Sequence, residues 1–263
     1  MAGIETFRAE TGAALGRLPS LKTRYPEVGE ILDFYARVLE RQLVIAAEVG
    51  IGGGPIAEIP WRTHVSPLRA FLDLCTEAPA AELARGAERL RGLDDAGLAA
   101  LVETFLREKQ APPVERFLLT GFLGGALARP AALAPYDRQQ WLQGVCPVCG
   151  FPPVVSYLAD RDEVEGARFA RCGVCHADWH FGRATCLACG NTNDHELHYY
   201  VPDGTPSPVT VQACSACGAY IKLIDTRGVP QGTPELDDVA TMTLDLWVRD
   251  KGYHKVSPNL FAF

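Results

Sequence analysis

The chain has 263 residues, of which 48% are hydrophobic and 22% charged, a composition typical of a globular protein with one domain or two. Its formal net charge of −7 argues against broad, sequence-independent binding to nucleic acid or anionic lipid, because both attract basic surfaces. No apolar run approaches the roughly 20 residues that a membrane-spanning helix needs. Residues 1–16 lack the basic and apolar regions of a secretory signal, so the cytoplasm is the expected compartment.

The first part of the chain, residues 1–144, predicts a small helical bundle. In residues 25–50, apolar side chains recur at three- and four-residue steps, and one polar residue, Gln42, interrupts the stripe. Gly50 is expected to end this helix. Shorter helical patterns follow at 66–78, 94–111 and 114–128. Ser66 is a candidate N-cap for the first of these, and the short connections favour a bundle.

Eight of the nine cysteines lie between residues 146 and 217, and the texture of the sequence changes there. Short β-favouring runs such as FPPVVSYL and YIKLI alternate with Gly, Pro and Asn, which predicts a small β module stapled by metal. In the cytoplasm, cysteines are more often metal ligands or reactive thiols than disulfides. Cys75 stands apart and is expected to be a small buried hydrophobe.

The segment TPELDDVATMTLDLWVRDKGY predicts one closing helix, with Thr233 or its neighbour at the N-cap. Acids crowd its first turn. Asp237, Asp238 and Asp245 are interpreted through the helix macrodipole, which favours negative charge near a helix start.

The eight clustered cysteines form four CxxC pairs, each of which a tight loop can present to one metal ion. The pairs are Cys146 and Cys149, Cys172 and Cys175, Cys186 and Cys189, and Cys214 and Cys217. Four thiolates around one ion make a tetrahedral site. Glycine follows the second cysteine of three pairs, where a positive φ lets backbone amides point at the sulfurs. His176 takes this position in the remaining pair, and the sequence does not explain the departure.

The spacing of the pairs favours sequential pairing into two sites. The first and second pairs are 22 residues apart and the third and fourth are 24 apart, whereas only 10 residues separate the second pair from the third. The near-equal gaps indicate a duplicated ribbon. The first site would use Cys146, Cys149, Cys172 and Cys175, and the second Cys186, Cys189, Cys214 and Cys217. An interleaved cross-brace is the alternative that spacing alone does not exclude.

The role of such sites is less specific than their presence. Most closed four-cysteine sites are structural staples that supply folding free energy on the order of 10 kcal/mol each. A single CxxC acting as a thioredoxin-like redox pair is disfavoured, because four pairs at ligand spacing would be superfluous for it. Eight thiolates already fill two coordination spheres, so the nearby histidines are assigned to supporting or surface roles. These are His176, His180, His195 and His198.

Aromatic residues crowd the cysteine region, either as core filling or as a surface that grips a partner. They are Trp179, His180, Phe181, Tyr199, Tyr200 and Tyr220. From Cys146 to Asp225 there are five Lys/Arg against nine Asp/Glu, which is the wrong sign for a protein that reads phosphates.

Several segments taken together resemble the formate dehydrogenase accessory proteins, the FdhE family. They are CPVCGFPPV, RFARCGVCHADWHFGRATCLACG, ACSACGAYIKLI, DDVATMTLDLWVRDKGY and, more approximately, the ending SPNLFAF. The resemblance is close from Cys146 onward and looser over the helical half. It implies a cytoplasmic factor that binds the catalytic subunit of a molybdenum- or tungsten-dependent formate dehydrogenase during maturation. It also implies rubredoxin-type knuckles, able to hold iron, at all eight cysteines.

The predicted fold class is α+β. The expected parts are a helical domain at 1–144, two tandem rubredoxin-like or zinc-ribbon-like modules at 145–183 and 184–230, and a C-terminal helix and tail at 231–263. The sequence shows no nucleophile–base constellation and no carboxylate pair in a catalytic context, so an enzyme is not expected.

Three functions are weighed. The first is a maturation factor that binds the catalytic subunit of formate dehydrogenase, with two metal ions, iron or zinc, per chain. The second is a rubredoxin-like redox protein acting on the active site of that client. A zinc-ribbon nucleic-acid binder is disfavoured by charge. The native metal and the oligomeric state, with a dimer as one option, are left open.

Overall fold

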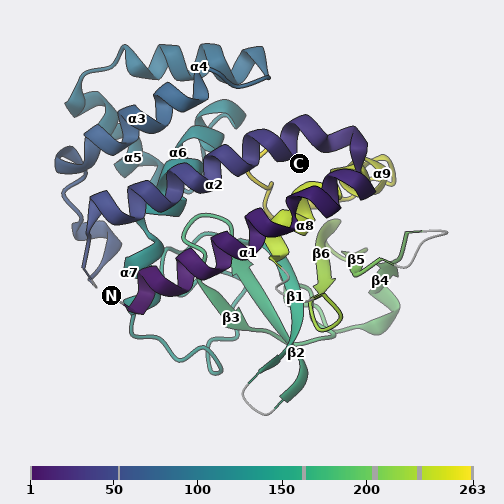
Figure 1. Ribbon diagram of the computed structural model, residues 1–263. Coiled ribbons are helices and arrows are strands. Elements are labelled where there is room, and N and C mark those ends of the chain that lie inside the picture. Colours follow the sequence, from purple (N-terminus) through teal and green to yellow (C-terminus); the bar gives the residue numbers. More distant parts are fainter. Residues whose placement is uncertain (1, 53, 162–163, 203–206, 230–232, 262–263) are drawn as a thin grey trace. The chain divides into compact units, whose positions relative to one another are not determined.

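The computed structural model describes residues 2–52, 54–161, 164–202, 207–229 and 233–261 (Figure 1). The chain forms two compact units. The helical unit comprises Met1–Ala134 and Val174–His176, and the cysteine unit comprises Pro135–Gly173 and Ala177–Phe263. The predicted α+β fold, helices followed by a sheet with two four-cysteine clusters, is confirmed. Among the described residues, no helix has both the length and the apolarity to cross a bilayer.

The helical unit is built from seven α-helices and three short 3-10 turns within the described residues. They are α1 (Ala2–Arg24), η1 (Pro26–Val28), α2 (Gly29–Val49), η2 (Ile56–Glu58), η3 (Trp61–His64), α3 (Val65–Cys75), α4 (Ala81–Arg91), α5 (Asp95–Glu108), α6 (Pro113–Ala126) and α7 (Ala128–Leu133). The predicted helix in residues 25–50 is confirmed as α2. It ends at Gly50, whose φ of 55° is the left-handed conformation that glycine adopts without penalty.

The polar break in the α2 stripe has a structural reason. Gln42 is buried, and its Nε2 donates a hydrogen bond to the carbonyl of Gly121 in α6 at 2.9 Å. A Cβ at Gly121 would lie 2.3 Å from Cζ of Phe71, and one at Gly125 would lie 2.6 Å from the carbonyl oxygen of Gln42. Glycines therefore let α6 approach its neighbours closely enough for this hydrogen bond to form.

Helix α3 differs slightly from expectation. Ser66 was expected at the N-cap, but His64 holds that position and Ser66 lies in the first turn, because α3 continues directly from η3. Cys75 is fully buried at the end of α3, and burial raises the pKa of its thiol to about 12. It therefore behaves as the small buried hydrophobe that the sequence predicts.

Within the described residues, the cysteine unit consists of a seven-stranded sheet, two α-helices and one short 3-10 turn. Its elements are β1 (Pro153–Arg161), β2 (Val164–Cys172), β3 (Asp178–His180), η4 (Asp194–Glu196), β4 (Leu197–Tyr200), β5 (Val209–Cys214), β6 (Ala219–Asp225), α8 (Pro234–Ala240), α9 (Met242–Asp250) and β7 (His254–Lys255). The strand order is β3-β2-β1-β6-β5-β4, and β7 pairs with β6. Strands β1 to β3 form one antiparallel ribbon and β4 to β6 another.

The two ribbons join through a parallel pairing of β1 with β6, in which Ser156 lies opposite Leu223. In each ribbon, the first strand follows one cysteine loop and the second strand runs into the other. Because β1 and β6 are parallel, the cysteine loops of both ribbons lie at the same edge of the sheet. The duplicated ribbon thus builds one continuous sheet with two cysteine clusters along one edge.

The sheet has one face packed against helices and one against a loop. On the first face, Leu244 of α9 packs against two apolar clusters, one containing Val209 and the other Val248. On the opposite face, residues 182–185, which link the ribbons, lie over Arg168 of β2 and accept hydrogen bonds from it.

The predicted single closing helix is instead two, α8 and α9, separated at Thr241. Thr241 leaves helical geometry, with φ −109° and ψ 31°. The buried Nζ of Lys222 donates to the carbonyls of Asp238 and Thr241, at 2.8 and 2.9 Å. A lysine of the sheet thus binds backbone groups that a continuous helix would use internally, which explains the break.

Candidate metal centres

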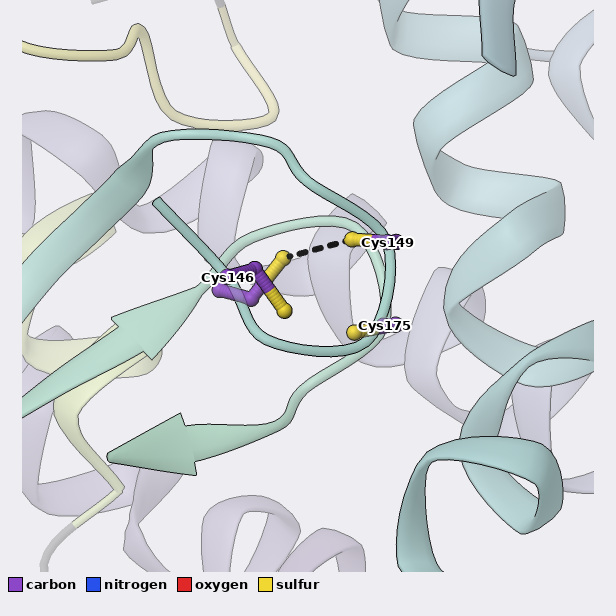
Figure 2. A group of neighbouring side chains, drawn as sticks. Cys146, Cys149 and Cys175 are labelled. Atoms are coloured by element: carbon purple, nitrogen blue, oxygen red, sulfur yellow. Dashed lines mark hydrogen bonds between the residues drawn. The ribbon is translucent and has the colours of Figure 1, made fainter. Parts of the chain in front are cut away.

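The structure brings the eight knuckle cysteines together as two groups of four. The sulfur atoms of each group all lie within 4.8 Å of one another. The first group is Cys146, Cys149, Cys172 and Cys175, and the second is Cys186, Cys189, Cys214 and Cys217. This is the sequential arrangement, not the interleaved one. Among the described residues, no histidine or carboxylate belongs to either group. Figure 2 shows the sulfurs of Cys146, Cys149 and Cys175 facing a common centre.

The four cysteine loops share one backbone geometry. Gly150, Gly190 and Gly218 each donate an amide hydrogen bond to the carbonyl of the first cysteine in their pair, at 2.9 to 3.0 Å. Their φ angles are 73°, 76° and 72°. His176, at the same place in the remaining loop, has φ 60°. The position therefore requires the left-handed conformation, and the histidine adopts it despite its Cβ.

The sulfur spacing fits a tetrahedral metal ion. Metal–sulfur bonds of about 2.3 Å place neighbouring sulfurs about 3.8 Å apart in a tetrahedron. Sulfur–sulfur distances are 3.7 Å for Cys186 and Cys217, 3.9 Å for Cys189 and Cys214, and 3.3 Å for Cys149 and Cys172. The amide of Val148 also lies 3.4 Å from the sulfur of Cys146, as in loops that stabilise thiolate charge. Both groups could thus hold an ion that prefers four soft ligands.

The two groups differ in exposure. All four cysteines of the first group are buried. In the second group Cys189 is exposed and Cys217 is partly exposed. An ion in the second group would therefore be open to solvent and to a partner on one side.

The thiols of the second group differ in how readily they lose a proton. The side-chain amide of Asn191 lies 3.6 Å from the sulfur of Cys214. Burial opposes ionisation of this thiol, but the amide and backbone donors outweigh it and lower the pKa of Cys214 to about 7. Burial raises the pKa of Cys217 to about 12. A metal ion would have to displace the remaining protons, so its binding would strengthen as pH rises.

The segment Asp178-Trp179-His180 forms β3 and anchors the approach to the first group. The buried carboxylate of Asp178 accepts a hydrogen bond from Tyr157 at 2.7 Å and from Arg161 at 3.0 Å. The indole nitrogen of Trp179 donates to the carbonyl of Gln143 at 2.9 Å. The Asp178 contacts tie β3 to β1, and the Trp179 contact holds the chain just before Cys146. This segment therefore positions the first group and does not join it.

The guanidinium groups around Asp178 set its ionisation. Burial alone would raise its pKa, but Arg171, Arg161 and Arg138 hold the pKa of this carboxyl below its ordinary value. The nearest nitrogen of Arg138 is 2.9 Å from the carboxylate.

A buried network of lysines and acids lies under the second ribbon. Lys222 binds Asp245 at 2.5 Å and Asp238 at 3.2 Å, and Lys255 binds Asp238 at 2.7 Å and Asp245 at 3.2 Å. Asp245 does lie in the first turn of α9, as the macrodipole interpretation expects, but Asp238 lies beyond the first turn of α8. Both acids are fully buried against lysines, which the sequence interpretation did not include. Their spacing was no signal in the sequence, because Asp238 belongs to α8 and Asp245 to α9, and the two lysines come from β6 and β7.

The aromatic residues divide between core and surface. Trp179, Phe181 and Tyr220 are buried, whereas Tyr199 is 48% exposed. A partly exposed aromatic patch nevertheless exists: the partly buried Tyr200 contacts the exposed Trp247 and the partly buried Tyr253 at ring-centroid distances of 5.3 and 6.4 Å. Sequence reasoning missed Trp247 because it belongs to α9, outside the cysteine region.

Two family models match the chain. They are described as "FdhE, central domain", over residues 145–183, and "FdhE, C-terminal domain", over residues 184–262. The chain is also 31% identical over 268 residues to the protein FdhE homolog of Aquifex aeolicus (strain VF5), covering 95% of this chain and 94% of that protein.

Other relatives match over a shorter span. The protein FdhE of Escherichia coli O127:H6 (strain E2348/69 / EPEC) is 33% identical over 132 residues, covering 50% of this chain and 41% of that protein. The crystal structure of the FdhE protein from Pseudomonas aeruginosa superimposes with a TM-score of 0.72 at 22% identity, covering 97% of this chain and 96% of that one. At this low sequence identity, the match shows that the two proteins share a fold.

Proposed function

The chain belongs to the FdhE family, and from this membership we propose that it is a maturation factor for a molybdenum- or tungsten-dependent formate dehydrogenase. It binds the catalytic subunit in the cytoplasm while that subunit matures, and it acts as an accessory protein rather than an enzyme. The observation that supports the proposal is similarity to an FdhE homolog over almost the full length of both proteins.

The proposal includes two metal ions, iron or zinc, one in each four-cysteine group. All eight cysteines act as ligands, and the glycine-bearing loops direct backbone amides toward their sulfurs. Iron would supply one-electron chemistry there, whereas zinc would supply structure only.

The client surface is proposed to be the partly exposed aromatic patch formed by Tyr200, Trp247, Lys251 and Tyr253. Trp247 is 44% exposed, and Nζ of Lys251 lies 4.4 Å from the centre of its ring. Tyr200 and Tyr253 pack against the apolar cluster that contains Ala213, the neighbour of Cys214. Exposed aromatic side chains are enriched at protein interfaces, and here they lie beside the more open cysteine group.

A pull-down tests this function. The tagged full chain is expected to retain the catalytic subunit of formate dehydrogenase, and Trp247→Ala is expected to weaken retention at least about fivefold, since interface aromatics often contribute more than 1 kcal/mol. Leu142→Ala is the matched control, because Leu142 is also an exposed apolar residue but lies outside the patch. No retention of the subunit by the unaltered chain would overturn the proposed function.

The exposure of the second group favours a second candidate, a redox protein that acts on the client's active site. This role needs iron at the site where Cys189 is exposed, and an external donor that supplies one electron at a time. Metal content and the visible spectrum of protein purified without oxygen distinguish a redox role from a purely structural one. Iron with thiolate colour that bleaches reversibly on reduction supports the redox role. Two zinc ions and no colour after iron-replete expression exclude it.

A further inference from the structure

Arg168 of β2 is a fully buried cation, and within the described residues it has no carboxylate partner. Its guanidinium group instead donates to neutral oxygens. Nη1 donates to the carbonyls of Gly182, Arg183 and Thr185 at 3.0 to 3.1 Å, and Nη2 donates to Oγ of Ser156 at 3.2 Å and Oε1 of Gln212 at 2.7 Å.

A charge in this position calls for an anion nearby. Burial of a cation without a counter-charge is costly, and carbonyl dipoles offset only part of the cost. Burial lowers the pKa of Arg168 to about 10, so the group is still charged at neutral pH. One of its carbonyl partners, Thr185, directly precedes Cys186, the first cysteine of the second group.

Four thiolates around a divalent ion carry a net charge of about −2, because each thiolate contributes one negative charge. We infer that Arg168 is the counter-charge of the second four-cysteine group and sets both the metal retention and the reduction potential of that site. The inference rests on the proposed metal binding. It gives β2 of the first ribbon a function in the site of the second ribbon.

The sign of the effect follows from charge. Adding one electron to a four-thiolate ferric site changes its net charge from about −1 to about −2, and a nearby cation stabilises the more negative state more strongly. Loss of the cation should therefore make the site harder to reduce. With zinc bound, the same loss should raise the proton affinity of the thiolates and speed metal release.

Two variants remove the charge in different ways. Arg168→Met deletes it. Gln212→Glu keeps Arg168 and its carbonyl contacts but places a carboxylate where Oε1 of Gln212 now accepts at 2.7 Å, which neutralises the guanidinium without deleting it. Arg168→Lys keeps the charge, and Gln212→Met alters the neighbour without adding one. Circular dichroism verifies that each variant is folded.

The measurement is an anaerobic dithionite titration of the iron-loaded full chain, followed by visible absorbance. Arg168→Met and Gln212→Glu are each expected to lower the equilibrium constant for reduction of one site at least about threefold, or about 30 mV at 59 mV per tenfold. The other site should not move. Asn191→Ala removes the side-chain amide beside Cys214 and identifies which titration step belongs to the second group.

Unchanged midpoints in both folded variants would overturn the inference. So would an Arg168→Lys shift as large as that of Arg168→Met, since the forked contacts rather than the charge would then be responsible. If the chain takes up zinc but not iron, release to a chelator replaces the titration. One of the two zinc ions should then leave at least about threefold faster from Gln212→Glu than from Gln212→Met, and equal rates would refute the inference. A chain that binds neither metal refutes the proposed metal sites themselves, a result distinct from metal binding without a shift.

Discussion

Three glycines and one histidine occupy the same left-handed position after the second cysteine of the four loops. From the glycines, the sequence predicts a positive φ at three of these positions, and from the cysteine spacing it predicts the sequential pairing into two groups. It does not predict His176, because the requirement for positive φ arises from loop geometry that only the structure shows. The histidine thus marks a place where the fold imposes a conformation that its own residue disfavours.

Paired substitutions at position 176 measure that cost. His176→Gly and His176→Ala both remove the imidazole, so a difference between them reports the backbone alone. We expect the Ala variant to be less stable than the Gly variant by about 1 kcal/mol, the penalty for a Cβ in the left-handed region. Urea unfolding of the two variants measures this difference in the free energy of unfolding. Gly150→Ala provides a reference, because Gly150 holds the same position in another loop. Equal stabilities would show that the loop relaxes out of the left-handed conformation.

At the scale of single elements, the sequence predicts a helix where its apolar periodicity is strong, but it does not reveal features that depend on contacts with distant residues. The stripe of α2 predicted both its helix and its end at Gly50. Helix α1 escaped prediction because Gly12, Gly16 and Pro19 depress its propensity, so that packing against other helices must stabilise it. The split between α8 and α9 depends on Lys222, a residue of β6, and no reading of the closing segment alone could have found it.

Strand β3 owes its place to Asp178, and this makes the cysteine unit sensitive to acid. The folded pKa of Asp178 is below its ordinary value of about 3.9. Its contribution to stability is therefore fully present above that value and is lost as pH falls through the folded pKa. Asp178→Asn should lower the free energy of unfolding by about 3 kcal/mol at neutral pH, because it removes the buried carboxylate that Arg138, Arg161 and Arg171 share. The difference in the free energy of unfolding between the unaltered chain and the variant should become smaller below about pH 4.

Chemical unfolding of both proteins from pH 7 to pH 3 tests this expectation. Asp225→Asn is a suitable control, since Asp225 also pairs with an arginine but at a partly exposed site, where ion pairs contribute about 1 kcal/mol or less. If the difference in unfolding free energy between Asp178→Asn and the unaltered chain stayed constant from pH 7 to pH 3, the assigned ionisation of Asp178 would be contradicted.

For the whole molecule, the sequence revealed the duplication of the cysteine ribbons but not their union. The pairing of β1 with β6 joins residues that are far apart in the chain, and no local pattern specifies such a contact. Its consequence is that the two ribbons share backbone hydrogen bonds. If both groups hold metal as proposed, each ion stabilises a sheet to which the other is also attached.

Because the ribbons share one sheet, loss of the metal ion from one group should destabilise the other ribbon. Cys189→Ser removes an exposed ligand of the second group and should release that ion while leaving the four cysteines of the first group in place. Because β6 is then less well held, β1 loses a stable neighbour, and its amides should exchange with deuterium at least about tenfold faster. Amides of α2 serve as the internal reference. Exchange in β1 that matches the unaltered chain, with one ion demonstrably lost, would mean that the ribbons unfold independently despite their common sheet.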